Sequence, residues 1–254
     1  MLFALALLLL IVPLTVSSAE TKREITVSAA LSLKSAFEEI GRMYEARRKV
    51  TKVTFNFGAS GDLMRQIEGG APVDVFASAA PAEMDELEKK GLIVKGTRAD
   101  FAKNATILVA HSNMKTRLHS FTDLLSGDIK RIAVGNFKTV PAGRYAEEIF
   151  RHYKILPLIK DRLIFTANVR QVLDYIDRNE VDAGVVFATD VQARSKNVAI
   201  AAVADERSHS KAVYPIGMIT NSKNRKPAEE FITLVRSAEG QKILRKYGFK
   251  PIGE

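Results

Sequence analysis

Residues 53–79 read VTFNFGASGDLMRQIEGGAPVDVFASA and indicate the fold class of the chain. Residues 53–57 alternate apolar and polar side chains, which is the pattern of a half-buried strand. Apolar side chains then recur at helical spacing from Leu63 to Ile67, and two glycines end that helix. Residues 74–77 form a short apolar run of the buried-strand type. A strand, a helix and a second strand in succession are typical of an α/β protein.

The same alternation extends over the rest of the chain. Apolar runs of strand length predict further strands at residues 25–28, 107–110, 131–134, 163–165, 183–187, 198–203 and 214–219. Apolar residues spaced three or four apart predict helices at residues 33–44, 81–91, 141–153, 169–176, 231–235 and 243–247. We therefore expect α/β sheets with helices on both faces.

Composition narrows the classes of chemistry that the chain can carry. The sequence has 254 residues and no cysteine, which excludes disulfides, thiolate metal sites and cysteine nucleophiles. It also excludes a lipid-modified cysteine, so export would leave the protein unanchored. The four histidines lie far apart in sequence, so short metal-binding spacings are missing. We expect no cofactor and no metalloenzyme, although a site built from carboxylates alone stays open.

The chain is basic, with a formal net charge of +9. Such a charge fits nucleic acid, acidic membranes or small anions as partners. The lysines and arginines are scattered, with the densest clusters at residues 47–49 and 242–250. The chain has no tryptophan and no aromatic run of the kind that stacks on single strands. The sequence therefore gives little support for nucleic-acid binding. A solvated surface explains most of the charge.

The first residues have the pattern of an export signal. Residues 2–14 read LFALALLLLIVPL, which is too short for an ordinary membrane span. Small residues at Ser17 and Ala19 follow, as signal peptidase requires. No lysine or arginine precedes the apolar run, as if the start lay upstream or the free amino group supplied the charge. An uncleaved anchor is the alternative to a cleaved signal. We predict a signal peptide at residues 1–19 and a periplasmic protein.

Four turns that each follow a strand and open a helix are candidates for anion binding. They lie at residues 29–33, 57–63, 140–144 and 167–170. Helix N-termini expose unpaired backbone N–H groups, and small residues let an anion approach them. Ser32 and Ser60 add hydroxyl groups at predicted capping positions. Either serine taken singly is typical of an ordinary helix cap.

Two enzyme-like motifs in the chain are incomplete. Residues 58–62 read GASGD, which lacks the last glycine of the hydrolase elbow G-x-S-x-G. Residues 91–97 have the glycine spacing of a phosphate loop, but Thr97 occupies the position of its essential lysine. Without a visible nucleophile and base, we expect no catalytic residue.

Several segments resemble the periplasmic molybdate-binding proteins of ABC transporters. The most specific are FGASGDLMRQIEGGAPVDVFASA at 57–79 and AVGNFKTVPAGRYA at 133–146. VSAALSLKSAFEEI at 27–40 and NVRQVLDYIDRNEVDAGVVFATD at 168–190 also match. The resemblance spans nearly all of the chain after the signal segment. It implies a type II periplasmic binding protein fold, in which each lobe is a mixed sheet flanked by helices and the chain crosses between lobes twice.

The resemblance also implies lobe boundaries and a ligand site. Lobe 1 would comprise residues 20–103 and 216–254, and lobe 2 residues 104–215. The family's site uses two serine hydroxyls, two backbone N–H groups and a tyrosine. By motif, these correspond to Ser32, Ser60, Ala142, Val169 and Phe187. Phenylalanine stands where the family has tyrosine. The hydrogen bond of the missing hydroxyl must therefore come from the side chain of Asn168 or Thr189 or from a water, or the site is one donor short.

The implied function is the capture of molybdate, and also tungstate, for the inner-membrane permease of an ABC transporter. Both ions are fully deprotonated at neutral pH, so a site made only of donors suits them. Asp62 is the only acidic candidate near the four turns, and at a helix start it is typical of a dipole-stabilising residue. A binding protein for sulfate or another tetrahedral oxyanion is the alternative. A secreted enzyme on the same scaffold is the alternative from another class. We expect a monomer that does not bind nucleic acid.

Overall fold

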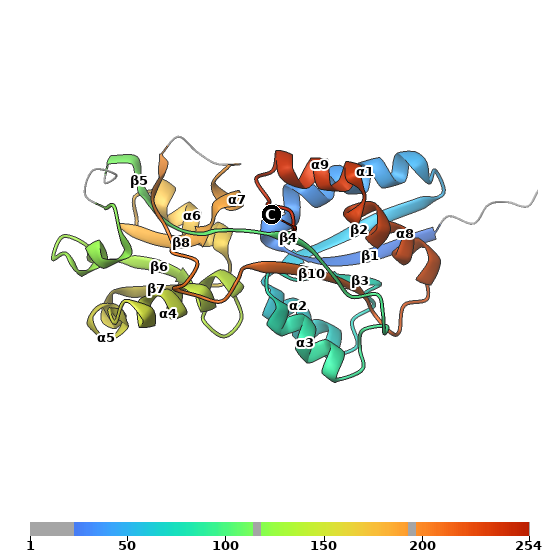
Figure 1. Cartoon of the computed structure of the whole chain (residues 1–254), viewed down its shortest axis with the longest axis horizontal. Coiled ribbons are helices and arrows are strands. Elements are labelled where there is room, and N and C mark those ends of the chain that lie inside the picture. The colour runs from blue at the N-terminus through green and yellow to red at the C-terminus, as the bar shows by residue number, and fades with distance from the viewer. Residues whose placement is uncertain (1–22, 114–117, 193–196, 254) are drawn as a thin grey trace, which may run out of the picture.

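The computed structural model describes residues 23–113, 118–192 and 197–253, and it forms two lobes (Figure 1). The predicted signal peptide at residues 1–19 lies outside the described residues. Each lobe is built on one five-stranded mixed sheet. Helices cover both faces of each sheet. The predicted α/β fold with two lobes is therefore confirmed.

The first sheet has the strand order β2-β1-β3-β10-β4. Strand β1 is parallel to β2 and β3, and β10 is antiparallel to β3 and β4. The bounds are β1 Arg23–Ala30, β2 Thr51–Gly58, β3 Val75–Ala77, β4 Ala99–Lys103 and β10 Val213–Met218.

The second sheet has the order β7-β6-β8-β5-β9. Strand β6 is parallel to β7 and β8, and β5 is antiparallel to β8 and β9. The two sheets therefore share one pattern. Three parallel strands are followed by an antiparallel fourth strand, and the fifth strand is antiparallel to the fourth. The bounds are β5 Thr106–His111, β6 Ile132–Gly135, β7 Leu163–Thr166, β8 Ala183–Phe187 and β9 Val198–Val203.

Aromatic packing fills the core of the first lobe. Figure 1 shows α1, α8 and α9 on one face of its sheet and α2 and α3 on the other. The ring centroid of Phe231 lies 5.9 Å from that of Phe37 and 5.8 Å from that of Tyr44. The short helix η1 (Leu31–Leu33) precedes α1. The bounds are α1 Lys34–Arg47, α2 Ser60–Glu68, α3 Pro81–Lys89, α8 Arg225–Arg236 and α9 Ala238–Lys246.

In the second lobe, neighbouring residues of β6 belong to opposite faces. Ile132 packs with Ile149 and Phe150 of α4, whereas Ala133 packs with Val172 and its neighbours on α6. This alternation is the period of two that a strand imposes. The helices are α4 Pro141–His152, α5 Leu156–Ile159, α6 Val169–Asp177 and α7 Ala188–Val191, with shorter turns η3 Phe121–Leu125 and η4 Lys160–Arg162.

The chain passes between the two sheets twice. Strand β4 ends at Lys103 and β5 begins at Thr106, and β9 ends at Val203 before β10 begins at Val213. Strand β10 pairs with the first sheet from Val213 onward, so the return passage lies in residues 204–212. The division of the chain into lobes at 103/104 and 215/216 stays a proposal. Within the described ranges, no helix is both long and apolar enough to cross a membrane.

Candidate functional site

A small cavity lies where the carboxyl ends of the parallel strands of both sheets meet. Its volume is about 20 Å³. One water needs about 10–15 Å³ of such space. All five residues predicted for the site, which come from both lobes, line it. The complete lining is Ala30, Leu31, Ser32, Gly58, Ala59, Ser60, Ala79, Val140, Pro141, Ala142, Asn168, Val169 and Phe187.

The lining of this cavity contains no charged side chain. Its polar groups are backbone amides, two serine hydroxyls and the amide of Asn168. Asp62, the acidic candidate, pairs with Arg65 on α2 and does not line the cavity. The cavity can therefore offer several neutral donors to a small ligand, and no carboxylate to accept a proton from it.

The serine hydroxyls do not cap helices. The N-cap of α2 is Ala59, and neither α2, η1 nor α1 has a side-chain cap bond. Ser60 is fully buried, and its Oγ accepts a hydrogen bond from Ala79 N at 3.0 Å. That bond leaves the Ser60 hydrogen available for a ligand. The prediction that these serines occupy capping positions is therefore wrong, because each sits inside a helix with its hydroxyl directed elsewhere.

The second lobe presents backbone N–H groups at two helix starts. Ala142 is the second residue of α4 and Val169 the first residue of α6. N–H groups at these positions have no acceptor inside their own helix. The start of α4 packs directly against the end of β6. A Cβ at Gly143 would stand only 2.1 Å from the carbonyl oxygen of Gly135, so a side chain has no room there. This glycine therefore lets α4 begin at the edge of the sheet.

Phe187 closes one wall of the cavity with an apolar ring. It is the last residue of β8 and is 1% exposed. Its ring centroid lies 5.7 Å from that of Tyr214 and 6.0 Å from that of Tyr145. Of the two side chains considered as substitutes for the missing hydroxyl, Asn168 lines this cavity and Thr189 does not. The Oδ1 of Asn168 caps α6 by accepting from Gln171 N at 3.1 Å, so its amide nitrogen is the part left for a ligand.

Two further polar residues, which the sequence did not indicate, lie behind the cavity wall. Tyr214 on β10 is fully buried, and its hydroxyl oxygen is 3.1 Å from Ser32 Oγ. Asn104, in the first passage between the lobes, donates its Nδ2 to the same hydroxyl at 3.1 Å. Burial raises the pKa of Tyr214 well above its usual value, which keeps the hydroxyl protonated. The local sequence around Tyr214 does not indicate that its hydroxyl contacts Ser32, which is 182 positions away.

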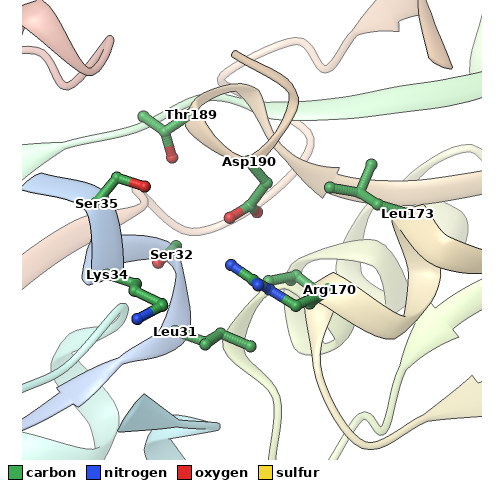
Figure 2. Close-up of a pocket in the computed structure, with 9 residues that line it drawn as sticks. Leu31, Ser32, Lys34, Ser35, Arg170, Leu173, Thr189 and Asp190 are labelled. Atoms are coloured by element: carbon green, nitrogen blue, oxygen red, sulfur yellow. The ribbon is translucent and has the colours of Figure 1, made fainter. Parts of the chain in front are cut away.

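A second cavity of about 40 Å³ adjoins the first and shares Leu31, Ser32 and Val169 with it. Figure 2 shows Lys34 and Arg170 approaching it from opposite lobes, with Arg170 reaching toward Ser32. Asp190 also lines it. Lys34 pairs with Glu38, and its ammonium lies 5.0 Å from the centre of the Phe57 ring. With Glu38 and Asp190 beside these two cations, the mouth of the neutral cavity carries charges of both signs.

The two lobes touch directly beside the site. Gly61 N in α2 donates to the Thr139 carbonyl oxygen of the other lobe at 3.0 Å. Arg144 on α4 forms an ion pair with Glu83 on α3. These contacts close the cleft around the cavity.

Two curated proteins are similar to this chain over most of its length. The chain is 37% identical over 233 residues to YvgL of Bacillus subtilis, whose name describes a substrate-binding lipoprotein of an ABC transporter, and the match covers 92% of this chain and 88% of that one. It is 34% identical to the molybdate-binding protein ModA of Escherichia coli, over 89% of this chain and 88% of that one.

Solved structures share the two-lobed fold at lower identity. The periplasmic molybdate-binding protein of Azotobacter vinelandii matches with a TM-score of 0.79 and 19% identity, over 89% of this chain and 98% of that one. The sulfate-binding protein SubI of Mycobacterium tuberculosis matches with a TM-score of 0.78 and 16% identity, over 91% of this chain and 87% of that one. The fold alone therefore does not separate the two anions.

A family model described as bacterial extracellular solute-binding protein matches residues 25–250. That range contains every residue that lines the cavity and, apart from Arg23 and Glu24 of β1, all strands of both sheets. The chain therefore belongs to the bacterial extracellular solute-binding protein family and is a substrate-binding protein of an ABC transporter.

Proposed function

We propose that this protein captures molybdate, and also tungstate, in the cavity between its lobes and delivers it to the inner-membrane permease of an ABC transporter. The observation that carries the proposal is a small cavity whose lining, drawn from both lobes, offers hydroxyl and amide donors and no charged side chain. The names of relatives at 32% and 34% identity support the choice of ion. Periplasmic export after removal of residues 1–19, and action as a monomer, belong to the same proposal.

Each lining residue has a role in this proposal. The hydroxyls of Ser32 and Ser60 donate from the first lobe, and the N–H groups of Ala142 and Val169 donate from the second. Phe187 fills the remaining wall and excludes water, which strengthens the surrounding hydrogen bonds. A ligand held from both sides stabilises the closed arrangement of the lobes, because the open form provides only half of the donors.

The protonation state of the ligand distinguishes molybdate from phosphate. Phosphate keeps a proton near neutral pH, and a site for it benefits from a carboxylate that accepts this proton. The cavity lining has none. Molybdate, tungstate and sulfate carry no proton at neutral pH and can only accept hydrogen bonds. Sulfate is the smaller ion, so its exclusion would depend on donors placed too far apart to reach it.

The bonds of the two serines do not favour an enzyme. Activation of a serine nucleophile requires a base at hydrogen-bond distance. Ser32 Oγ is paired with the Tyr214 hydroxyl, and Ser60 Oγ accepts from a backbone amide. Neither arrangement takes up a proton from serine, so we propose that the protein performs no covalent chemistry.

Titration calorimetry with sodium molybdate, tungstate, sulfate and phosphate tests the proposal. We expect tight binding of the first two and much weaker binding of the others. Molybdate at a hundredfold excess over Kd should also stabilise the fold by about 2.7 kcal/mol, which a melting curve detects. Equal affinity for sulfate and molybdate would refute the assignment to molybdate. The absence of binding to all four ions would refute the oxyanion site.

A further inference from the structure

We propose that Tyr214 is a positioning residue, whose hydroxyl receives a hydrogen bond from Asn104 and donates one to Ser32, so that the Ser32 hydroxyl points its hydrogen at the bound oxyanion. The proposal rests on the proposed function, since it concerns the same site. Tyr214 lines neither of the two neighbouring cavities. It therefore acts through Ser32 and does not touch the ligand.

The orientation of the Asn104 amide is set by the backbone. Its Oδ1 accepts from Ala105 N at 2.9 Å, so Nδ2 faces the other way. Nδ2 donates to Tyr214 Oη at 3.1 Å and to Thr189 Oγ1 at 2.8 Å. An amide nitrogen is only a donor. The Tyr214 oxygen must therefore accept from Asn104.

The direction of the next bond follows from what the Tyr214 hydrogen can reach. Within the described part of the chain, the hydroxyl of Tyr214 has two partners, Asn104 Nδ2 and Ser32 Oγ. Asn104 cannot accept through Nδ2, so Ser32 Oγ is the acceptor for the Tyr214 hydrogen. The opposite direction would leave a fully buried hydroxyl hydrogen without an acceptor, which is costly.

The consequence reaches the ligand through Ser32. Once Ser32 Oγ accepts from Tyr214, its own hydrogen is left for the cavity that Ser32 lines. A deprotonated oxyanion can only accept, so every donor must be turned toward it. Consecutive hydrogen bonds of the same direction also polarise one another and strengthen the last. The chain Asn104 to Tyr214 to Ser32 thus prepares Ser32 as a donor before the ligand arrives.

The position of these residues in the fold keeps the chain of bonds rigid. The Tyr214 ring is held between aromatic rings, with centroids 5.3 Å from Phe249 and 5.7 Å from Phe187. Asn104 lies between β4 and β5, in the first passage between the lobes. Because packing holds the ring itself, Tyr214→Phe removes the hydroxyl with little change in shape.

The test compares Tyr214→Phe with a matched tyrosine that packs against the same ring. Tyr145 also contacts Phe187, at 6.0 Å between centroids, but its hydroxyl donates to the Lys211 carbonyl at 3.3 Å. In molybdate titrations we expect Tyr214→Phe to raise Kd roughly 3- to 10-fold. We expect Tyr145→Phe to stay within about 2-fold of the natural protein.

A double-mutant cycle separates positioning from general support of the fold. In a Ser32→Ala background, Tyr214→Phe should change Kd by less than about 2-fold, because the hydroxyl it positions is gone. An equal loss with and without Ser32 would overturn the proposal. If Tyr214→Phe does not fold, Asn104→Ala serves in the same cycle and should raise Kd in the same direction. An unchanged Kd in that folded variant would likewise overturn it.

The natural protein in the same titration distinguishes the two proposals. If it binds molybdate and Tyr214→Phe binds equally well, only the positioning role fails. If the natural protein binds none of molybdate, tungstate, sulfate and phosphate, the proposed function fails, and the role of Tyr214 fails with it.

Discussion

Arg144 in the second lobe and Glu83 in the first lobe form an ion pair across the cleft. The Glu83 side chain is only 4% exposed, whereas that of Arg144 is 27% exposed. A buried carboxylate that loses its partner is strongly destabilised. The pair therefore favours the closed arrangement of the lobes, in which the carboxylate has its cation.

Arg144→Gln is expected to weaken molybdate binding. The closed form would then bury a carboxylate without its cation, held among the described residues only by a hydrogen bond of 3.4 Å from Ser78 Oγ, and opening would let water reach it. Because Arg144 is partly exposed, we expect a cost of about 1–3 kcal/mol, or roughly 5- to 100-fold in Kd. Arg151→Gln is the control, since Arg151 is on the same helix but pairs with Glu147 at an exposed position. Small-angle scattering should show a larger radius for ligand-free Arg144→Gln, and an unchanged radius and Kd would contradict the role of this pair.

Ser60→Ala is expected to separate ligand binding from helix capping. A hydrogen bond to a charged group contributes about 1.5–3 kcal/mol, so Kd should rise roughly 10- to 100-fold. Ser237 is the matched control, because its Oγ does cap α9 by accepting from Gly240 N at 3.2 Å. Ser237→Ala should lose about 1 kcal/mol of stability and keep its Kd. Titration and melting curves of both variants measure the contrast, and a Ser60→Ala variant with unchanged Kd would refute the role of this hydroxyl.

Gly61→Ala is expected to block closure of the lobes. A Cβ at Gly61 would stand 2.8 Å from both the Cα and the carbonyl oxygen of Thr139 in the other lobe. Backbone atoms cannot yield as a flexible side chain does, so the lobes must separate. We expect a loss of affinity of at least about 10-fold, with little change in the melting temperature of the ligand-free protein, since alanine suits a helix.

Gly69→Ala is the control for this variant, because a Cβ there would meet only carbonyl oxygens of its own helix at 3.4 Å. Equal Kd values for the two glycine variants would show that contact at Gly61 does not govern closure.

Phe187→Tyr is expected to leave molybdate affinity unchanged or to lower it. The ring is buried between two tyrosine rings and faces a cavity of about 20 Å³. A new hydroxyl would compete for space and for the ligand with the Asn168 amide, which already lines that cavity. Titration of the variant decides the question. A gain of roughly 10-fold or more would show that the site lacks one donor and captures its ion less tightly than it could.

Local patterns in the sequence were sufficient for most of the elements. The alternation in residues 53–57, the helical spacing after Ser60 and the apolar run before Ser78 predicted β2, α2 and β3, because each pattern reflects burial of one face. Strand β4 was missed. Its sequence ADFAK has charged residues at two of five positions, so its pairing with β10 decides its structure and its hydropathy does not.

Four of the five predicted site residues, Ser32, Ser60, Ala142 and Val169, lie in turns between a strand and a helix that the sequence pattern indicates. Phe187, the last residue of β8, was chosen from the family resemblance alone. The family resemblance implied that these turns contribute to one ligand site. That they line one cavity follows from the sheets, which bring the carboxyl ends of β1, β2, β6, β7 and β8 to the same place. The function of the cavity stays a prediction until a ligand is measured.

Most of the succession of strands and helices along the chain, the α/β class and the turns that could hold an anion were predictable from sequence, because these depend on residues close together in the chain. The directions in which the hydroxyl hydrogens can point, and the contacts between the lobes, depend instead on residues far apart in the chain. Ser32 and Tyr214 are 182 positions apart, and Glu83 and Arg144 are 61 apart. Such pairs are created by strand order and lobe closure, and no local pattern of residues encodes them.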